Sequence, residues 1–476
     1  MLTRDQFQLL YDQGPDAVYL LLVAMQQQID ALTTRVQELE VRLSKDSHNS
    51  SKPPSSDQPG KKPVSLRPKT SKPSGGQKGH PGTTLSFSET PDQIIWHCPK
   101  VCLACGYSLA DGAVTGQERR QVWDLPPLRL FVTEHRIAPC ICPHCQTKNQ
   151  AAFPKIVSQP VQYGPGVLAL GVYLLHYQLL PYTRTRQLFL DLFNHAPSEG
   201  TLATALSTCH STLSEVETAI KEAVARACVV HLDETSLRVK KSLHWLHVSS
   251  TPYLTFYAPH KKRGRDALNA IGLLPRLLGV RVHDAWPAYL SYGGRFALCN
   301  AHLLRELIGL YEQTKQTWTQ RLLRLLLSLK RAKEKAQARG EPALPPALLL
   351  RFFRVYEQIV ARGLKRNPPP APTNRVGRPN KSDARNLLER LHKHPQAMLR
   401  FAWDFRVPFD NNLAERDLRM VKVRQKVSGC FRSEDGLKQF CRIRGYLSTL
   451  RKQGQQILAA LQSVFTGDPL YPKIYA

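Results

Sequence analysis

The stretch Pro408-Phe-Asp-Asn-Asn-Leu-Ala-Glu-Arg-Asp-Leu-Arg-Met-Val-Lys-Val-Arg-Gln-Lys426 predicts a helix with an acid near its start. The side chains of Asp-Asn-Asn at 410–412 can cap amides that a first helical turn leaves unpaired. Glu415 follows one turn later, where it suits a metal site beside a phosphate chain; its alternative role is an ordinary capping pair with Asn412. Basic residues recur after this acid, and we predict that they contact phosphates: Arg416, Arg419, Lys422 and Lys426.

Two apolar runs earlier in the chain each end in an acid. Ala227-Cys-Val-Val-His-Leu-Asp-Glu-Thr235 predicts a buried strand that ends at Asp233, and Gly279-Val-Arg-Val-His-Asp-Ala-Trp286 predicts a second that ends at Asp284. Between these runs the sequence predicts strands at 244–249 and 253–258 and a helix at 266–278. Two strand-end acids followed by a helix acid is the order by which a ribonuclease-H-like fold gathers three carboxylates.

Asp233, Asp284 and Glu415 are therefore candidates for a site that holds Mg²⁺ or Mn²⁺. Magnesium takes oxygen ligands in octahedral geometry, usually a few carboxylates together with substrate phosphate. Two such ions about 4 Å apart can activate an attacking oxygen and stabilise the leaving one. Each acid also has a simpler explanation: a strand-end salt bridge for Asp233 or Glu234, a helix cap for Asp284, a capping box for Glu415. Together, in so basic a chain, they favour the metal site.

The composition predicts a polyanionic partner. The 476 residues include 66 Lys and Arg against 37 Asp and Glu, a formal net charge of +29. Neutralising phosphates releases condensed counterions, so nucleic acid is the partner that this charge favours. The loop at 260–265 adds three candidate DNA contacts: Lys261, Lys262 and Arg263.

A membrane is not expected as the partner. The longest apolar stretch, 167–180, is broken by His176 and Gln178, and no signal-peptide pattern opens the chain. We therefore expect an intracellular protein whose eleven cysteines stay reduced, as metal ligands and core residues rather than disulfides.

Cys102-Leu-Ala-Cys105 and Cys142-Pro-His-Cys145 predict a structural zinc site. Each C-x-x-C pair can offer two thiolates to one tetrahedral Zn²⁺ ion. Their separation is longer than a compact zinc ribbon uses, and two strand-like segments, 117–126 and 130–137, are expected to fill it. Several neighbours leave an exchange of ligands open: His97, Cys98, Cys140 and His144. The alternatives are reduced core cysteines or a redox pair.

The N-terminal segment, 1–43, predicts a helix that forms a coiled coil. Its apolar residues recur in steps of three and four: Leu22, Met25, Ile29, Leu32, Val36, Leu39 and Leu43. So narrow a seam matches coiled-coil packing better than the broad face of a helix docked on its own domain, which is the alternative. Residues 44–93 follow as a basic linker rich in Pro and Ser, which either lies along DNA or is simply solvated.

Residues 151–226 are predicted to be helical. Helices at 183–193 and 199–213, with Ser198 as N-cap, have the outline of a DNA-binding helix-turn-helix. An ordinary helical hairpin is an equal alternative, because no Lys or Arg lies near the start of the second helix.

Residues 301–405, between the second and third acids, are also predicted to be helical. The predicted helices lie at 301–313, 318–339, 347–362 and 383–403. A basic, proline-rich loop at 368–379 interrupts them, and its Gly377-Arg-Pro379 is a candidate for minor-groove contact.

Several motifs share one resemblance. They are His231-Leu-Asp-Glu-Thr235, Cys299-Asn-Ala-His-Leu-Leu-Arg-Glu-Leu307, the stretch 408–419, Lys426-Val-Ser-Gly-Cys-Phe-Arg432, and two linker motifs, Asn49-Ser-Ser-Lys-Pro-Pro-Ser-Ser-Asp57 and Gly75-Gly-Gln-Lys-Gly-His-Pro-Gly82. Together they resemble the transposases of the IS66 insertion-sequence family. The resemblance covers about residues 35 to 465, and the block around Glu415 is highly specific.

The resemblance implies a multidomain α+β protein with a ribonuclease-H-like α/β catalytic core. Its expected parts are a coiled coil (1–43), a basic linker (44–93), a zinc-binding module (94–150), a helical DNA-binding region (151–226), the first part of the core (227–300), a helical insertion (301–405) and the end of the core (406–476). The metal-binding triad falls on Asp233, Asp284 and Glu415. Cys299 and His302 are similar to a C-x-x-H pair of such transposases and are candidate site support; the alternative is a core Cys beside a buried His.

The resemblance also implies a function. A DDE transposase cuts DNA at the terminal inverted repeats of its element and joins the 3′-hydroxyl ends to target DNA, without a covalent protein–DNA intermediate. The expected partners are double-stranded DNA, a second copy of the chain through the coiled coil, and small accessory proteins of the same element, on the nucleoid in the bacterial cytoplasm. Two other interpretations stay open: a catalytically silent DNA-binding regulator or domesticated transposase, and a ribonuclease-H-fold nuclease that cuts without joining.

Overall fold

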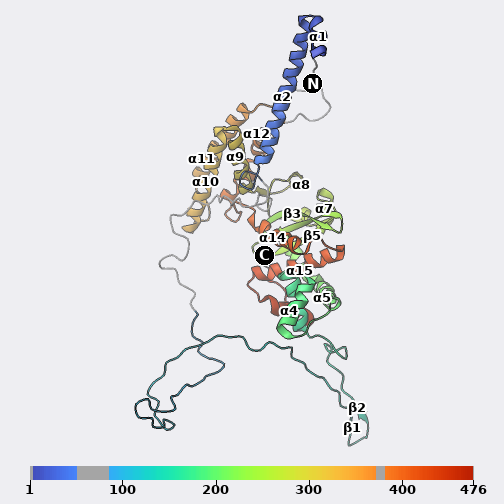
Figure 1. Cartoon of the computed structure of the whole chain (residues 1–476), viewed down its shortest axis with the longest axis vertical. Coiled ribbons are helices and arrows are strands. Elements are labelled where there is room, and N and C mark those ends of the chain that lie inside the picture. Colours follow the sequence, from blue (N-terminus) through green and yellow to red (C-terminus); the bar gives the residue numbers. More distant parts are fainter. Residues whose placement is uncertain (1–3, 51–84, 371–380, 475–476) are drawn as a thin grey trace. The chain divides into compact units, whose positions relative to one another are not determined.

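The computed structural model describes residues 4–50, 85–370 and 381–474 (Figure 1). Most of the predicted linker and the minor-groove candidate at 377–379 lie outside the described residues. The chain divides into two compact units. The larger consists of Met1–Val64, His135–Leu188 and Pro197–Ala476, and the smaller of Ser65–Glu134 and Phe189–Ala196. Within the described ranges, every helix is too short or too polar to span a lipid bilayer.

A five-stranded sheet lies at the centre of the larger unit, with the strand order β5-β4-β3-β6-β7. The strands are β3 (Val229–Val239), β4 (Ser242–Ser250), β5 (Thr255–His260), β6 (Val280–His283) and β7 (Phe296–Leu298). β3, β4 and β5 run antiparallel to their neighbours, whereas β6 and β7 continue the sheet in parallel from β3. The sequence predicted the first four strands. It did not predict β7, because three residues are too few to show a period.

The prediction that β3 ends at its acid is wrong. β3 continues past Asp233 to Val239, because its second half pairs with β4 as an antiparallel hairpin, from His231↔Ser250 to Val239↔Ser242. β6 does end at its acid as predicted, since Asp284 directly follows the last residue of that strand.

A close backbone approach sets β6 against the start of β3. The amide of Val280 donates a 2.8 Å hydrogen bond to the carbonyl of Cys228. A Cβ atom at Gly279 would overlap the carbonyl oxygens of Ala227 and Cys228, so a side chain cannot be accommodated there. Glycine at this position therefore permits the parallel register Val229↔Val280.

Different helices cover the two faces of the sheet. On one face, α14 (Asn412–Ser428) packs its apolar stripe against β3 and β4, with Leu418 close to Leu237 and Val248 in one buried cluster. The other face carries a larger core with α3 (Pro165–Val172), α5 (Glu199–Thr212), α6 (Ser214–Arg226) and α16 (Ile457–Phe465). Helix α15 (Glu434–Lys452) contributes residues to both cores.

The predicted helical insertion is a bundle whose core also includes buried residues of β6 and β7 (Figure 1). Its helices are α9 (Asn300–Thr314), α10 (Thr317–Ala338), α11 (Pro346–Arg366), α12 (Asp383–Lys393) and α13 (Pro395–Trp403). The single helix predicted at 383–403 is two helices, because Pro395 lacks an amide hydrogen and starts a new helix. The helix predicted at 266–278 is also shorter: α7 (Arg265–Ile271) ends at Gly272, whose φ of 68° is left-handed.

Other helix predictions are confirmed. At the N-terminus lie α1 (Arg4–Asp12) and α2 (Pro15–Ser44), and all seven seam residues of α2 are exposed. The region after residue 164 holds α3, a π-helix (Tyr173–Tyr177), α4 (Tyr182–Phe193), α5 and α6. Ser198 caps α5 as predicted, since its Oγ accepts a 3.0 Å hydrogen bond from the amide of Thr201.

The strands predicted at 117–126 and 130–137 are absent, and that prediction is wrong. Most apolar side chains there are exposed, Val122 at 91% and Phe131 at 86%, so the alternating pattern has no core to face. The only strands described between 94 and 150 are β1 (Cys140–Ile141) and β2 (Lys148–Asn149), which pair with each other.

Candidate active site

Asp233, Asp284 and Cys299 are aligned by the registers of three neighbouring strands. β3 pairs with β6 at His231↔Val282, so the residues two positions further along each strand are Asp233 and Asp284. The register of β6 and β7 places Cys299 beside Asp284 in the same way, and the Cys299 amide donates to the His283 carbonyl at 2.9 Å. The parallel registers thus place two acids and a thiol side by side, where β6 and β7 end and β3 continues.

Glu415 joins these acids from α14. The pKa of Asp233 is raised well above its usual value, first by burial and then by the negative charges of Glu234, Asp284 and Glu415. A carboxylate oxygen of Glu415 also lies within 4.8 Å of Sγ of Cys299, which the strand register places beside Asp284. The structure therefore gathers the three predicted acids, Asp233, Asp284 and Glu415, which we call the carboxylate cluster.

The carboxylate cluster has few partners of opposite charge. Among the described residues, Asp233 and Asp284 form no ion pair, and Glu415 has only His302, at 3.8 Å. Asp233 and Asp284 each accept a hydrogen bond from a following amide, of Glu234 at 2.8 Å and Trp286 at 3.0 Å. Such a set of hard oxygen ligands has the chemistry that a divalent cation requires.

The neighbouring acid, Glu234, is fully paired. Its side chain is only 2% exposed, and Arg263 contacts its Oε1 through Nη2 at 2.6 Å and Nε at 3.0 Å. The hydroxyl of Tyr289 donates to its other oxygen at 2.5 Å. The Arg263 guanidinium lies over the rings of Trp245 and Trp286, at 4.7 and 4.3 Å from their centres. These residues form what we call the Arg263 clamp, which the sequence did not reveal.

The basic loop predicted to contact DNA is engaged with carboxylates of the chain. Arg263 pairs with Glu234, Lys261 with Glu434 at 2.8 Å, and Lys262 with Asp266 at 2.8 Å. Lys261 and Lys262 are exposed, so their ammonium groups stay accessible, whereas Arg263 is held inside its clamp.

Asn411 attaches the start of α14 to the sheet. It is 1% exposed; its Nδ2 donates to the carbonyl of Leu232 at 2.8 Å, and its Oδ1 lies 2.9 Å from Nδ1 of His231. Its amide donates to Sγ of Cys299 at 3.1 Å. The sequence marked Asn411 only as a helix cap. An asparagine so close to the acid was a signal of a role at the site, but its hydrogen-bond partners could not be predicted because they lie far away along the chain.

The alternative role of Glu415, a capping pair with Asn412, is not found among the described residues. Oε1 of Glu415 is buried and accepts no hydrogen bond from any residue that the structure describes. The local cap is made by Asp410 instead, whose Oδ1 accepts from the Asn412 amide at 3.1 Å. Glu415 is thus directed toward Cys299 and His302. One carboxylate oxygen of Glu415, Sγ of Cys299 and one ring nitrogen of His302 all lie within 4.8 Å of one another.

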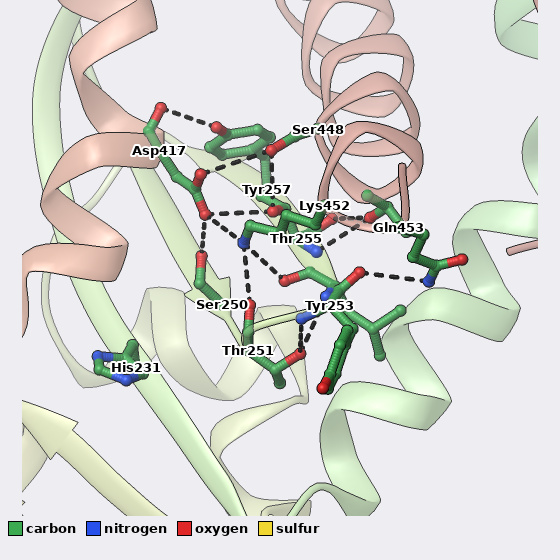
Figure 2. Close-up of polar contacts among 12 residues, drawn as sticks. His231, Ser250, Thr251, Tyr253, Thr255, Tyr257, Asp417, Ser448, Lys452 and Gln453 are labelled. Atoms are coloured by element: carbon green, nitrogen blue, oxygen red, sulfur yellow. Dashed lines mark hydrogen bonds and ion pairs between the residues drawn. The ribbon is translucent and has the colours of Figure 1, made fainter. Parts of the chain in front are cut away.

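A second set of contacts fixes α14 two residues beyond Glu415 (Figure 2). Asp417 pairs with Lys452 of α15 at 2.7 Å, and Ser250 of β4 and Thr255 of β5 donate to the same carboxylate at 2.6 and 3.1 Å. The hydroxyl of Tyr257 donates to the Asp417 carbonyl at 2.8 Å. We call these five residues the anchor network. It joins α14 to two strands and to α15, and so positions the helix that carries Glu415.

The cations predicted along α14 are exposed. They are Arg416, Arg419, Lys422 and Lys426. Lys422 also donates to the carbonyl of Ser236 at 2.8 Å, which holds its stem along β3. The helix therefore presents a basic surface that continues from its acid.

The two C-x-x-C pairs adopt the same local turn. The amide of Cys102 donates to the Tyr107 carbonyl and its own carbonyl accepts from Gly106, both at 2.8 Å. In the other pair, Cys142 makes the equivalent bonds with Thr147 and Gln146, both at 2.9 Å.

The turns also favour thiolates. Gly106 and Gln146, which follow the second cysteine of each pair, have φ of 71° and 57°. Hydrogen bonds from the backbone of Cys105 and Ala104 lower the pKa of Cys102, and those from Thr147 lower that of Cys145. Each turn can thus present two thiolates on one side.

Comparison with known proteins identifies the class to which the chain belongs. A family model described as "Transposase IS66 family" matches residues 160–439, more than half of the chain. The class is therefore that of transposases, which are DNA-processing enzymes. The chain therefore belongs to the IS66 family of transposases. A second model, a family of unknown function (DUF6444), matches residues 8–86. A search of curated proteins gave no match.

Proposed function

We propose that the chain is a DDE transposase, which cuts DNA at the ends of its element and joins the 3′-hydroxyl ends to target DNA by metal-dependent phosphoryl transfer. The observation that carries this proposal is the convergence of Asp233, Asp284 and Glu415 at one edge of the sheet. These acids are 51 and 131 residues apart in sequence. The pKa of Asp233 is raised first by burial and then by the charges of neighbouring acids, Asp284 and Glu415 among them.

The core of this enzyme is ribonuclease-H-like in our proposal. The strand order β5-β4-β3-β6-β7 supports it, with three antiparallel strands followed by two parallel ones. The position of the acids supports it as well: one on the central strand β3, one directly after β6, and one on a later helix that covers the same face. The helical bundle α9–α13 lies in sequence between the second and third acids.

The carboxylate cluster fits Mg²⁺ or Mn²⁺. It offers oxygen ligands and is short of cationic partners. The raised pKa of Asp233 shows that its charged form is disfavoured, and a bound divalent ion would stabilise that form. When bound, such ions would supply an activated water or hydroxyl and stabilise the leaving oxygen. Asp233, Asp284 and Glu415 would hold them. Asn411 and the anchor network would keep Glu415 in place, and the Arg263 clamp would hold β3 against the segment after Asp284.

The exposed cations of α14 would bind the DNA strand. Phosphate contacts fix the register of a nucleic acid without reading its sequence, which suits a strand that must cross a cleavage site. Arg416, Arg419, Lys422 and Lys426 lie on the helix that supplies Glu415, so a strand held by them passes close to the acid. Lys261 and Lys262 are further exposed candidates.

The two cysteine turns would bind structural Zn²⁺. Cys102 and Cys105 offer two thiolates, as do Cys142 and Cys145, and lowered thiol pKa values at Cys102 and Cys145 are what metal ligation requires.

The exposed seam of α2 would join two copies of the chain. The apolar residues Leu22 to Leu43 repeat at heptad spacing and are all exposed, so a second copy would cover them. Ile29→Lys should make the protein monomeric in sedimentation equilibrium, whereas Gln27→Lys, off the seam, should not. A dimer that survives Ile29→Lys would exclude this seam as the interface.

The substitution Asp284→Asn tests the central proposal. It removes a ligand charge at nearly constant volume, and replacing even an outer partner of a metal site costs about 10–100-fold. We therefore expect cleavage of DNA carrying the element ends to fall by at least about 100-fold, with binding to the same DNA unchanged. Asp435→Asn, at an exposed acid of α15, is the matched control.

The products of the cleavage assay separate the alternatives. Strand-transfer product from the wild-type chain supports a transposase, and cleavage without joining indicates a nuclease. Cleavage that persists in Asp284→Asn would remove the triad assignment. DNA binding with no magnesium-dependent cleavage by the wild-type chain would indicate a silent regulator.

A further inference from the structure

Three side chains have atoms close enough together to hold one metal ion. Two of them lie outside the predicted acid triad, and the third, Glu415, belongs to it. Sγ of Cys299, a nitrogen of His302 and a carboxylate oxygen of Glu415 all lie within 4.8 Å of one another. Cys299 precedes the first residue of α9 and His302 lies in its first turn, so the C-x-x-H spacing puts both side chains at one helix end. Glu415 approaches from α14. Tetrahedral Zn²⁺ separates such ligands by roughly 3.5 Å, so small side-chain movements suffice.

Two of these side chains carry a buried polar atom without a hydrogen bond. Within the described part of the chain, Nδ1 of His302 and Oε1 of Glu415 are buried and have no hydrogen-bond partner. The 3.8 Å between them is too long for a hydrogen bond to each other. Buried polar atoms are nearly always satisfied, and an ion between these two would satisfy both.

The third ligand, Cys299, is in a setting that stabilises a bound thiolate. Burial raises the pKa of its thiol to about 12, so without a metal it keeps its proton. Backbone amides of His302 and Asn411 oppose this by hydrogen bonding to the sulfur, the latter at 3.1 Å. A metal ion would displace the proton, and the same amides would then stabilise the thiolate.

We propose that Cys299, His302 and Glu415 bind a Zn²⁺ ion beside the carboxylate cluster. One sulfur, one nitrogen and one oxygen form a ligand set that zinc accepts and magnesium does not. Three protein ligands leave a fourth coordination position open. Because Glu415 belongs to both ligand sets, zinc bound here draws this carboxylate away from Asp233 and Asp284. The binding stands independently of the proposed function, whereas an inhibitory effect of zinc rests on it.

The binding is tested with Co²⁺ as a spectroscopic probe of the full-length protein. The metal-free wild-type chain and the Cys299→Ala variant are each titrated with Co²⁺. Any absorption from Co²⁺ bound to the two C-x-x-C turns is the same in both proteins and cancels in the comparison. We expect Cys299→Ala to bind one Co²⁺ fewer and to lose the corresponding thiolate charge-transfer absorption. Cys209→Ala, at a cysteine equally buried in another core, should leave both unchanged. Equal stoichiometry and spectra for the wild type and Cys299→Ala would overturn the proposal.

A second variant guards against loss of the fold. His302→Gln keeps the thiol and the packing of the helix, and it should also bind one Co²⁺ fewer at an unchanged circular dichroism spectrum. Full Co²⁺ binding by His302→Gln would contradict the site. Asp233→Asn should keep the additional ion even though it loses cleavage, which separates this site from the catalytic one.

The inhibitory effect is measured in the cleavage assay with excess Mg²⁺. Zinc should inhibit the wild-type chain, and the concentration for half inhibition should rise at least about tenfold in Cys299→Ala, with each variant compared with its own rate without zinc. Equal sensitivity in both would exclude competition for Glu415. Absence of cleavage by the wild-type chain would count against the proposed function and leave the Co²⁺ result standing.

Discussion

Glu415 and Asp417 lie two residues apart on α14, in opposite surroundings. Asp417 has a lysine at 2.7 Å and hydroxyl donors from two strands (Figure 2). Oε1 of Glu415 is buried without a hydrogen bond, among other acids. One carboxylate is fully compensated, whereas the other has, among the described residues, only the imidazole of His302 at 3.8 Å.

The difference separates structural from functional acids. A buried carboxylate whose charge is fully paired stabilises the arrangement of its elements, whereas a group of unpaired ones costs stability and is kept for another reason. Glu234 belongs with Asp417, since Arg263 and Tyr289 satisfy it. Asp233, on the same strand, belongs with Glu415. Substitutions at these residues test whether each carboxylate is compensated, like Asp417, or uncompensated, like Glu415.

The largest effect on stability is expected from Lys452→Met. Asp417 and Lys452 are 11% and 13% exposed, and removing the lysine leaves a buried charge without its counter-ion. Breaking such a pair costs about 3–5 kcal/mol in the free energy of unfolding. Urea denaturation followed by circular dichroism measures it, with Lys438→Met, at an exposed pair, as the control. A loss below about 1 kcal/mol, the range of surface pairs, would show that the hydroxyls alone compensate Asp417.

A smaller loss is expected from Arg263→Met. The change leaves Glu234 buried without its cation, but the Arg263 side chain is 38% exposed, so solvent screens part of the interaction. We expect a loss of about 2 kcal/mol, and cleavage lowered about 10–100-fold because the clamp lies behind Asp233 and Asp284. Arg263→Lys should restore little of either, since lysine lacks the planar group that pairs bidentately and stacks on rings. Full activity in Arg263→Met would place the clamp outside the reaction.

Asp233→Asn is expected to stabilise the metal-free protein. The folded-state pKa of Asp233 lies well above 3.8, its ordinary value. Between these two values the unfolded chain has released a proton that the folded chain retains, so the free energy of unfolding falls as pH rises. Asparagine does not titrate and removes this loss. With chelator present, the variant should therefore be more stable than the wild type at pH 7.

The pH dependence gives the check on this result. The advantage of Asp233→Asn in thermal unfolding should shrink as pH approaches 4, and added Mg²⁺ should stabilise the wild type more than the variant. An equal effect at both pH values would mean that Asp233 is compensated like Asp417.

The smallest effect on stability is expected from Arg419→Gln. Arg419 is an exposed residue of α14, and surface changes of this kind usually stay within about 0.5 kcal/mol. Its role would appear in DNA binding instead, as a slope of log affinity against log salt that is shallower by about one. An unchanged slope would remove Arg419 from the phosphate contacts.

Local patterns revealed most of the elements. The helices of the insertion and the strands β3 to β6 follow from periodicity, and the acids were found because two of them follow apolar runs. Pro395 shows the limit: the apolar pattern continues across it, but its missing amide hydrogen breaks the helix in two. The exposed segments 117–126 and 130–137 show a second limit of local patterns. An alternating pattern forms a strand only where a neighbouring strand pairs with it and a core covers its apolar face.

The partners of the site residues could not be predicted. Asn411 contacts residues 112 and 179 positions away, and Asp417 meets Ser250 at a separation of 167. Such contacts depend on the tertiary arrangement, and nothing in the local sequence distinguishes Asp417 from Glu415. The sequence therefore identified the acids of the cluster but not which neighbouring acids are compensated.

The course of β3 has a consequence for how the gene tolerates insertions and deletions. Neighbouring residues of a strand point to opposite faces, so Asp233 faces α14 while Glu234 faces the clamp. A one-residue insertion or deletion between Val229, which pairs with Val280 of β6, and Asp233 would exchange the faces of the two acids. The spacing from the first paired residue of β3 to its acid is therefore as important to the proposed site as the acid itself.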